Sequence, residues 1–154
     1  MKEETYQLIY TSQATSLLSV DQLREIDQKA TFYNPIHDIT GILLYAEGLF
    51  SSKLQGRFLG VLEGSFEALE KLARIIQKDG RHFNLVVLYM GLREHRDYMR
   101  WRLGYRKKEN KNDIISLDEF FDIDLLFAEN DLEKEQYLSQ FTYFENYGNS
   151  MSGS

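Results

Sequence analysis

The segment that decides the fold runs from Asn34 to Gly64 and reads NPIHDITGILLYAEGLFSSKLQGRFLGVLEG. It opens with an Asn-Pro pair. Proline lacks a backbone donor and disfavours helical geometry in the residue before it, so a preceding helix is expected to end there. The apolar run over 39–45 predicts a strand with Gly48 as the following turn, and 58–62 predicts a second, almost wholly buried strand. A helix end and two strands therefore meet in this segment, where we expect a binding cleft.

The same segment contains a short internal echo. Residues 48–55 read GLFSSKLQ and residues 56–63 read GRFLGVLE, so that Gly, Phe and Leu recur in register. Repeat architectures have periods of roughly 20 to 50 residues, so this echo does not indicate a solenoid. We interpret it as a lengthened hairpin arm or a short tandem duplication.

Caps and apolar periodicity predict the remaining elements. In a strand over 6–12, Tyr6, Leu8 and Tyr10 share one face by the period of two. The spacing of Ser19–Gln22 is that of a capping box, which predicts a helix start. The predicted elements are, in order, a strand over 6–12, a helix over about 20–32, the two strands described above, a helix between its cap Ser65 and its stop Gly80, and strands over 84–91 and 100–106.

The order βαββαββ predicts an α+β fold, a ferredoxin-like sheet with both helices on one face. In the last strand Trp101, Leu103 and Tyr105 alternate with arginines, so we expect the aromatic side to face in and the arginines to face out. Helix-start patterns near residues 116 and 130 predict a C-terminal helical appendage of two helices. The expected organisation is a domain over 1–110, an appendage over 111–147 and a frayed tail over 148–154.

The composition excludes several classes of function. The 154 residues contain no cysteine, so there is no disulfide, thiolate nucleophile, cysteine zinc site or cysteinyl flavin adduct. A net charge of −6 argues against a nucleic acid partner. The start lacks the apolar run of a signal peptide and no stretch approaches a membrane span, so we expect no membrane partner and a cytoplasmic location. The histidines lack ligand spacing, and no phosphate-binding loop or Ser-His-Asp pattern is present, so neither a metal site nor an enzyme is expected.

Eight short motifs, in this order, resemble the BLUF family of blue-light sensors that use FAD. They are LIYTS at 8–12, NP at 34–35, ITG at 39–41, LY at 44–45, VLEG at 61–64, DGRH at 79–82, RDY at 96–98 and WRLGY at 101–105. The resemblance covers residues 5–106 or so. It implies that the isoalloxazine ring of FAD lies between the two helices and that C-terminal helices pack against the sheet.

The resemblance also implies roles for individual residues. Tyr10 matches the tyrosine that donates an electron and a proton to the excited flavin, and Asn34 matches the amide that hydrogen-bonds the polar edge of the ring. The pair Arg81 and His82 matches the Arg-His pair at the end of the second helix, and Trp101 matches the tryptophan near the ring. A redox-active phenol, an amide with donor and acceptor, and a dry slot are what a buried flavin requires.

Two positions depart from the family pattern. Where the family has a Gln that bridges the tyrosine to the flavin and rearranges on illumination, this chain has Gly60, and the usual Met near the ring is Leu103. We expect Gly60 to leave a gap, so that the Tyr10 hydroxyl bonds to water, the flavin or another side chain. A bound flavin is then expected to show a weak or absent persistent red shift, with Tyr10 still able to quench its excited state.

Other interpretations remain open. Tyr10 and Trp101 can be core aromatics, Asn34 can simply end a helix, and Arg81 with His82 can cap the second helix. A BLUF-like module that no longer senses light and binds a partner protein is the main alternative. An acylphosphatase-like enzyme would need an anion-binding Arg loop after the first strand, which residues 11–15 lack. The output would pass to an unidentified downstream protein, and aromatic residues of the last helix could also form a homodimer surface.

Overall fold

The computed structural model describes residues 4–108, 114–121, 123–126 and 131–144. Within them the chain forms six strands and five helices. In order, they are β1 (Thr5–Ala14), α1 (Val20–Ile36), β2 (Thr40–Phe50), β3 (Lys53–Gly64), α2 (Phe66–Gln77), β4 (His82–Arg93), β5 (Trp101–Arg106), α3 (Leu117–Phe120), α4 (Ile123–Leu126), α5 (Asp131–Leu138) and β6 (Thr142–Tyr143).

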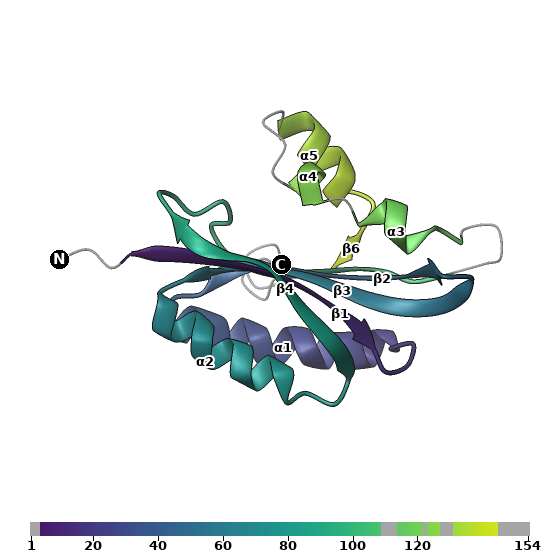
Figure 1. The fold of residues 1–154 in the computed structure, drawn as a ribbon, viewed down its shortest axis with the longest axis horizontal. Coiled ribbons are helices and arrows are strands. Elements are labelled where there is room, and N and C mark those ends of the chain that lie inside the picture. The colour runs from purple at the N-terminus through teal and green to yellow at the C-terminus, as the bar shows by residue number, and fades with distance from the viewer. Residues whose placement is uncertain (1–3, 109–113, 122, 127–130, 145–154) are drawn as a thin grey trace, which may run out of the picture.

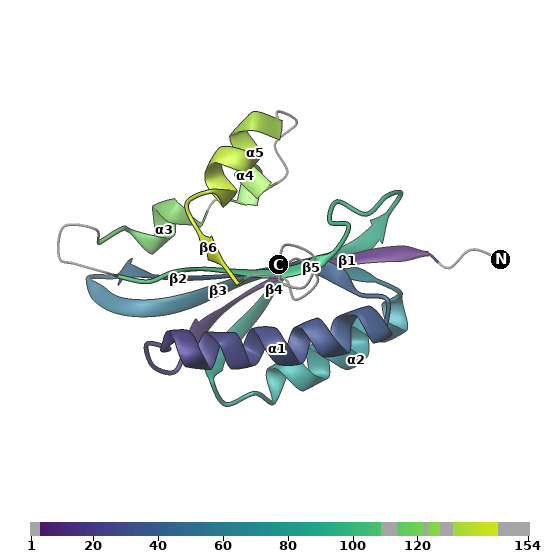
Figure 2. The same ribbon diagram turned by 180° about the vertical axis from the view of Figure 1, so that it is seen from behind.

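The six strands form one sheet in the order β4-β1-β3-β2-β5-β6. Helices α1 and α2 cover one face of this sheet, and the short helices α3, α4 and α5 lie on the opposite side (Figures 1 and 2). The predicted α+β, ferredoxin-like βαββαββ fold with two helices on one face is confirmed. The sheet therefore separates two layers, and each layer has its own core.

Both predicted helix caps are present, but the first helix is longer than expected. Ser19 and Gln22 form a reciprocal capping box at the start of α1, and the Ser65 hydroxyl accepts the Ala68 N–H at the start of α2. Helix α1 continues to Ile36, so the prediction that Asn34-Pro35 ends it was wrong by two residues. Proline in the last turn removes only one backbone hydrogen bond, which is a small loss once the helix is packed on a sheet.

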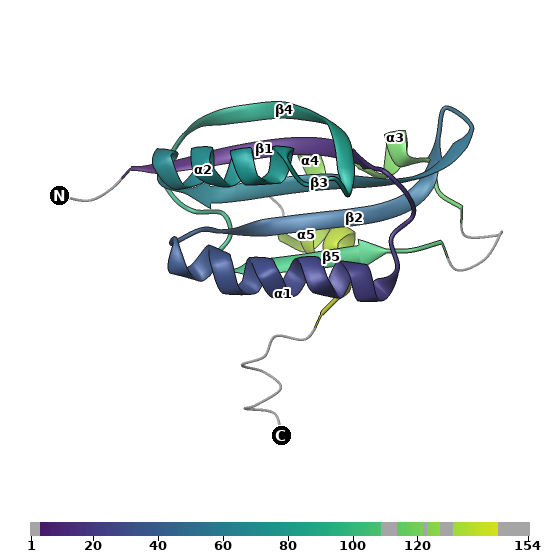
Figure 3. The ribbon, with the colours of Figure 1, turned by 90° about the horizontal axis from the view of Figure 1, so that it is seen from below.

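The β2–β3 hairpin is longer than the predicted strands, and its turn is not at Gly48. Strand β2 passes through Gly48, and the chain reverses at Ser51 and Ser52, whose φ angles are 51° and 67°. Two successive residues with positive φ form the kind of tight hairpin turn that suits the twist of paired strands. The lengthened arm predicted from the echo is present, and it reaches beyond the helices in Figure 3.

The two faces of the sheet follow the period of two. The helix-side core contains Leu8, Tyr10, Leu43, Tyr45, Phe58, Leu62 and Leu103, joined by Leu23 of α1 and Leu69 of α2. The opposite core contains Ile9, Ile42, Leu44, Leu59 and Val61, joined by Leu117, Leu126, Tyr137, Leu138 and Phe141 of the C-terminal segment. This alternation is the reason that both faces of the central strands are covered.

The C-terminal region differs from the predicted two-helix appendage. The part of it that the structure describes contains three short helices and the strand β6, which pairs with β5. The arginines of β5 do not face open solvent, because Arg102 lies over the ring of Tyr143 and Arg106 over that of Phe120. Cation–π contacts of this kind allow a charged face to be covered by aromatic residues. The predicted frayed tail over 148–154 lies outside the described residues.

None of the described helices is long and apolar enough to cross a membrane.

Candidate functional site

A cavity of about 390 Å³ lies on the helix side of the sheet, between α1 and α2. Its volume falls within the range of small-molecule sites, and most of its walls are apolar side chains. The sheet contributes Tyr10, Leu43, Leu62 and Trp101. The remaining lining residues are Ile26, Lys29, Ala30, Phe32, Tyr33 and Asn34 of α1 and its C-terminal turn, Leu72, Ile75 and Ile76 of α2, and Asp79 and Arg81 after it.

Tyr10 lies on β1, next to the edge strand β4, and directly against Gly60 of β3. The two residues are paired across β1 and β3, and a Cβ atom built on Gly60 would lie 2.3 Å from Tyr10 Cε1 and 2.9 Å from its hydroxyl oxygen. The expectation that Gly60 leaves a gap is therefore wrong, because the Tyr10 ring itself fills the space over the glycine. Burial and the Asp79 carboxylate both raise the pKa of Tyr10, so the phenol stays protonated at neutral pH.

Three polar groups that line the cavity have no protein partner among the described residues. The Tyr10 hydroxyl and the Asn34 side-chain amide form no hydrogen bond there, although Tyr10 is only 5% exposed and Asn34 only 2% exposed. The indole Nε1 of Trp101 is buried and also lacks a hydrogen-bond partner. Polar side chains without a protein partner on the wall of an apolar cavity suit a ligand with polar edges.

Asp27 lies behind the wall of the cavity, on the side of α1 that faces β5. It is only 6% exposed, and the Thr31 hydroxyl donates to it over 3.5 Å. Burial raises the pKa of Asp27 to about 6, an increase that Thr31 and the nearby Trp101 indole N–H partly oppose. The indole N–H is near this carboxylate but does not form a hydrogen bond of ordinary geometry with it.

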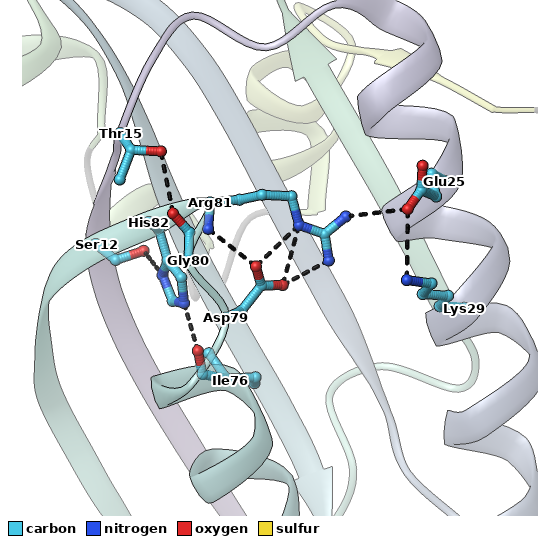
Figure 4. A network of polar contacts seen from close by, with 9 residues as sticks. All are labelled: Ser12, Thr15, Glu25, Lys29, Ile76, Asp79, Gly80, Arg81 and His82. Atoms are coloured by element: carbon cyan, nitrogen blue, oxygen red, sulfur yellow. Dashed lines mark hydrogen bonds and ion pairs between the residues drawn. The ribbon is translucent and has the colours of Figure 1, made fainter.

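A polar network links the end of α2 to α1 (Figure 4), and its members Lys29, Asp79 and Arg81 line the cavity. The Arg81 guanidinium donates to both carboxylate oxygens of Asp79, and the Arg81 backbone N–H donates to Oδ1. Arg81 also lies 3.9 Å from Glu25 on α1, which pairs with Lys29 one turn further on. The guanidinium holds the pKa of Asp79 below its ordinary value, so this carboxylate is ionised.

His82 does not reach the larger cavity, because both of its ring nitrogens are engaged. Nδ1 lies 2.7 Å from Ser12 Oγ and Nε2 lies 2.5 Å from the Ile76 carbonyl oxygen. The ring instead lines a second, smaller cavity together with Tyr10, Asp79 and Arg81. It ties the end of α2 to β1, as a structural cap would.

The structure brings together part of the predicted site. Tyr10, Asn34, Arg81 and Trp101 line the larger cavity, and Gly60 lies beneath the Tyr10 ring. Leu103 is 1% exposed in the helix-side core and is not among the lining residues, so it does not contact this cavity.

Sequence reasoning missed the α1 wall of the cavity and Asp79. The spacing of Ile26, Lys29, Ala30 and Tyr33 is that of one helical face, which could have predicted the wall once the cavity was known to lie beside α1. Asp79 belongs to the DGRH motif at 79–82, but only the folded chain brings it beside Tyr10.

Comparison with known proteins identifies relatives of this chain. The family model described as BLUF, sensors of blue-light using FAD, matches residues 5–104. The photoactivated adenylate cyclase subunit beta of Euglena longa is 37% identical over 103 residues, which are 66% of this chain and 11% of that protein. The same subunit of Euglena gracilis is 35% identical over the same share of each chain. The chain thus spans only about 11% of the length of these curated relatives.

Solved structures of similar fold carry related names. The structure called BlrP1 BLUF is 31% identical with a TM-score of 0.55, and the match covers 94% of this chain and 82% of that one. A bacterial light-regulated adenylyl cyclase is 29% identical with a TM-score of 0.56, over 70% of this chain and 29% of that one. The BLUF protein BlrB in its dark state is 25% identical with a TM-score of 0.54, over 88% of this chain and 86% of that one. The chain belongs to the BLUF family, the sensors of blue light using FAD.

Proposed function

We propose that this chain binds FAD in the cavity between α1 and α2 and serves as a cytoplasmic, BLUF-type blue-light module with impaired or altered photoswitching. The observation that carries the proposal is one apolar cavity of about 390 Å³ whose wall includes Tyr10 and Asn34, two polar side chains without a hydrogen-bond partner among the described residues. A flat ring system with hydrogen-bonding edges suits such a slot.

The side chains around the cavity fit a flavin. The Asn34 amide can donate and accept at the polar edge of a ring, and the Trp101 indole forms part of the apolar wall. Arg81 brings a guanidinium, which suits carbonyl or phosphate oxygens. When bound, the flavin would supply absorption of blue light and an excited state that accepts an electron. The apolar walls would keep water from this chemistry.

Tyr10 is the residue that we propose to respond to illumination. Its hydroxyl is protonated, buried and on the wall of the cavity, as a nearby electron and proton donor must be. Gly60 has no side-chain amide that could rotate and form a new hydrogen bond after light absorption. We therefore expect Tyr10 to quench the flavin while the persistent red-shifted state is weak or absent.

The C-terminal helices are the proposed output of the module. Strand β5 has Trp101 on the cavity side and Arg102 and Arg106 stacked on C-terminal aromatic rings on the other side. A change at the cavity can therefore alter the packing of the C-terminal segment through strand β5. This requires that the packing of the arginines on the aromatic rings has two states. We propose that the signal goes to a separate downstream protein and that this chain has no catalytic activity of its own.

A second candidate is a BLUF-like interaction module that does not respond to light. The contact between Tyr10 and Gly60 favours it, because the ring occupies the space in which a switching side chain would lie. In this case the protein would act through partner binding alone.

The visible absorption spectrum, recorded before and after blue light with the released cofactor identified, tests the proposal. A flavin band with little or no persistent red shift is the expected result. A full red shift would show that another group replaces the missing Gln. A colourless protein that does not take up added FAD would overturn the proposal and favour the interaction module.

The variant Gly60→Gln tests whether the glycine is the cause of weak switching. Installing the amide should make a red shift appear or strengthen, provided that the Tyr10 ring moves off β3 to admit it. If the variant binds FAD and its spectrum after illumination equals that of the wild type, the assignment of position 60 is wrong.

A further inference from the structure

A second cavity, of about 70 Å³, lies beside Tyr10 and adjoins the larger one, with which it shares six lining residues. It is large enough for water molecules, and polar groups form part of its wall. Its lining residues are Tyr10, Ile26, Leu43, Phe58, Ile76, Asp79, Arg81 and His82.

Asp79 is the one lining residue of this second cavity that offers an ionised acceptor. Both nitrogens of His82 are engaged elsewhere, and the Arg81 guanidinium can only donate. The Asp79 charge also acts on Tyr10, since this carboxylate contributes to the rise of the Tyr10 pKa. Tyr10 and Asp79 therefore line the same small cavity and interact electrostatically.

Arg81 binds the Asp79 carboxylate through only three N–H groups. Its backbone N–H, its Nε–H and one Nη2–H account for all four contacts with the carboxylate, because the Nε–H is shared between both oxygens. Each oxygen already accepts two of these contacts, but the shared Nε–H divides one hydrogen between two acceptors, so a further donor can compete with it for a lone pair. Bridging water is an ordinary donor at such a place, and it needs two or more polar partners.

We propose that water in the second cavity links the Tyr10 hydroxyl to the Asp79 carboxylate and orients the phenol in place of the missing glutamine amide. The Tyr10 O–H donates to the water, and the water donates to Asp79. The lone pairs of the Tyr10 oxygen then point away from the second cavity, so that Tyr10 acts as an acceptor towards the larger one. Asp79 is a positioning residue, and its effect on a flavin, though not the water link itself, rests on the proposed function.

The first test uses the protein without added flavin. In protein labelled with ¹³Cζ-tyrosine, the resonance that is lost in Tyr10→Phe belongs to Tyr10. We expect Asp79→Asn to shift this resonance, because the water loses its ionised acceptor. Glu25→Gln removes a charge from the same polar network without facing the second cavity, and it should leave the resonance in place.

Arg81→Gln separates the water link from the ion pair. It removes the guanidinium but keeps the carboxylate, so the Tyr10 resonance should stay closer to wild type than in Asp79→Asn. Equal shifts in both variants would show that Asp79 only holds Arg81, and no shift in Asp79→Asn would show that no link exists. A crystal structure should place a water within about 2.6–3.2 Å of both oxygens, and its absence would also overturn the proposal.

The second test uses the flavin-loaded protein. Quenching of flavin fluorescence by Tyr10 should slow roughly threefold to tenfold in Asp79→Asn, the equivalent of one lost hydrogen bond. Tyr10→Phe gives the limit of no quenching, and an unchanged rate in Asp79→Asn would contradict the proposed orientation. If no flavin binds, the proposed function fails, while the resonance test and the crystal structure still decide the water link.

Discussion

The hydrogen atom that serves as the side chain of Gly60 allows the Tyr10 ring to lie directly on strand β3. The same residue removes the amide that the family resemblance associates with switching. A single position therefore decides both where the phenol lies and what it can bond to. Any larger residue there must compete with the ring for the same space.

Gly60→Ala should destabilise the protein by about 1–3 kcal/mol, because its methyl group would lie 2.3 Å from Tyr10 Cε1 and force the ring to move. Urea unfolding measures this change. Gly80→Ala is the matched control, since a Cβ there meets no atom within 4 Å. If both variants unfold at the same urea concentration, the position of the Tyr10 ring does not require a glycine at position 60.

Asp27 should make stability depend on pH in a defined direction. Its pKa rises from 3.8 to about 6 on folding, so the folded state holds the proton more tightly than the unfolded state does. The stabilisation is fully present below about pH 4 and is lost as the pH rises through about 6, with a total of up to about 3 kcal/mol. The free energy of unfolding, measured from pH 4 to 8, checks the effect.

Asp27→Asn should remove this dependence, so that the variant gains stability relative to wild type as the pH rises. Asp21→Asn changes an exposed carboxyl on the same helix and should follow the wild-type curve. A constant difference between Asp27→Asn and wild type across the range would show that the buried carboxyl does not titrate there.

At the scale of elements, strand β5 is held at both ends by buried carboxylates of the β2–β3 hairpin. Before the strand, Glu63 is fully buried and accepts the backbone N–H groups of Asp97 and Tyr98. After the strand, Glu47 accepts the Lys107 ammonium over 2.9 Å and the Lys108 backbone N–H over 3.0 Å. These contacts fix the strand that has Trp101 on the cavity wall.

Glu47→Gln should cost about 2–4 kcal/mol, because it leaves the Lys107 ammonium without its buried counter-charge. The same substitution at Glu70, whose ion pair with Arg74 is exposed, should cost less than about 0.5 kcal/mol. Chemical denaturation of the two variants gives the comparison. Similar losses would mean that the Glu47 network adds little to the stability of the fold.

At the scale of the whole molecule, the C-terminal segment completes the second layer of the protein. Without it, the face of the sheet with Ile42, Leu44 and Val61 would be open to water. Burial of apolar area is the dominant favourable term in folding, so this segment belongs to the folding unit rather than to a loose tail. Its covering role also fits an output element that can change its packing.

Leu138→Ala should destabilise the protein by about 2–4 kcal/mol, since this side chain is 2% exposed in the second core. Leu132→Ala lies in the same helix at a side chain that is 64% exposed, and it should change stability by less than about 1 kcal/mol. Thermal unfolding of both variants is the measurement. Equal effects would show that α5 does not contribute to the core.

The sequence by itself determined the order of elements, the helix caps and the inward faces of the strands. Ser19, Ser65 and the alternation of Tyr6, Leu8 and Tyr10 act through neighbours one to four residues away, and such local rules can be read along a chain. It also determined that position 60 offers no side-chain donor or acceptor. The hairpin turn at Ser51 and Ser52 was missed because neither residue is the glycine that such turns usually have.

Only the tertiary structure decided how distant residues share space. In the folded chain the Tyr10 ring lies on Gly60, and Pro35 is inside α1. Leu103 is buried away from the larger cavity, and Asp79 lines a second cavity beside Tyr10. Each of these outcomes depends on side-chain volume and burial between segments far apart in the chain. Packing of this kind has no period along the sequence, and that is the physical reason it could not be predicted from it.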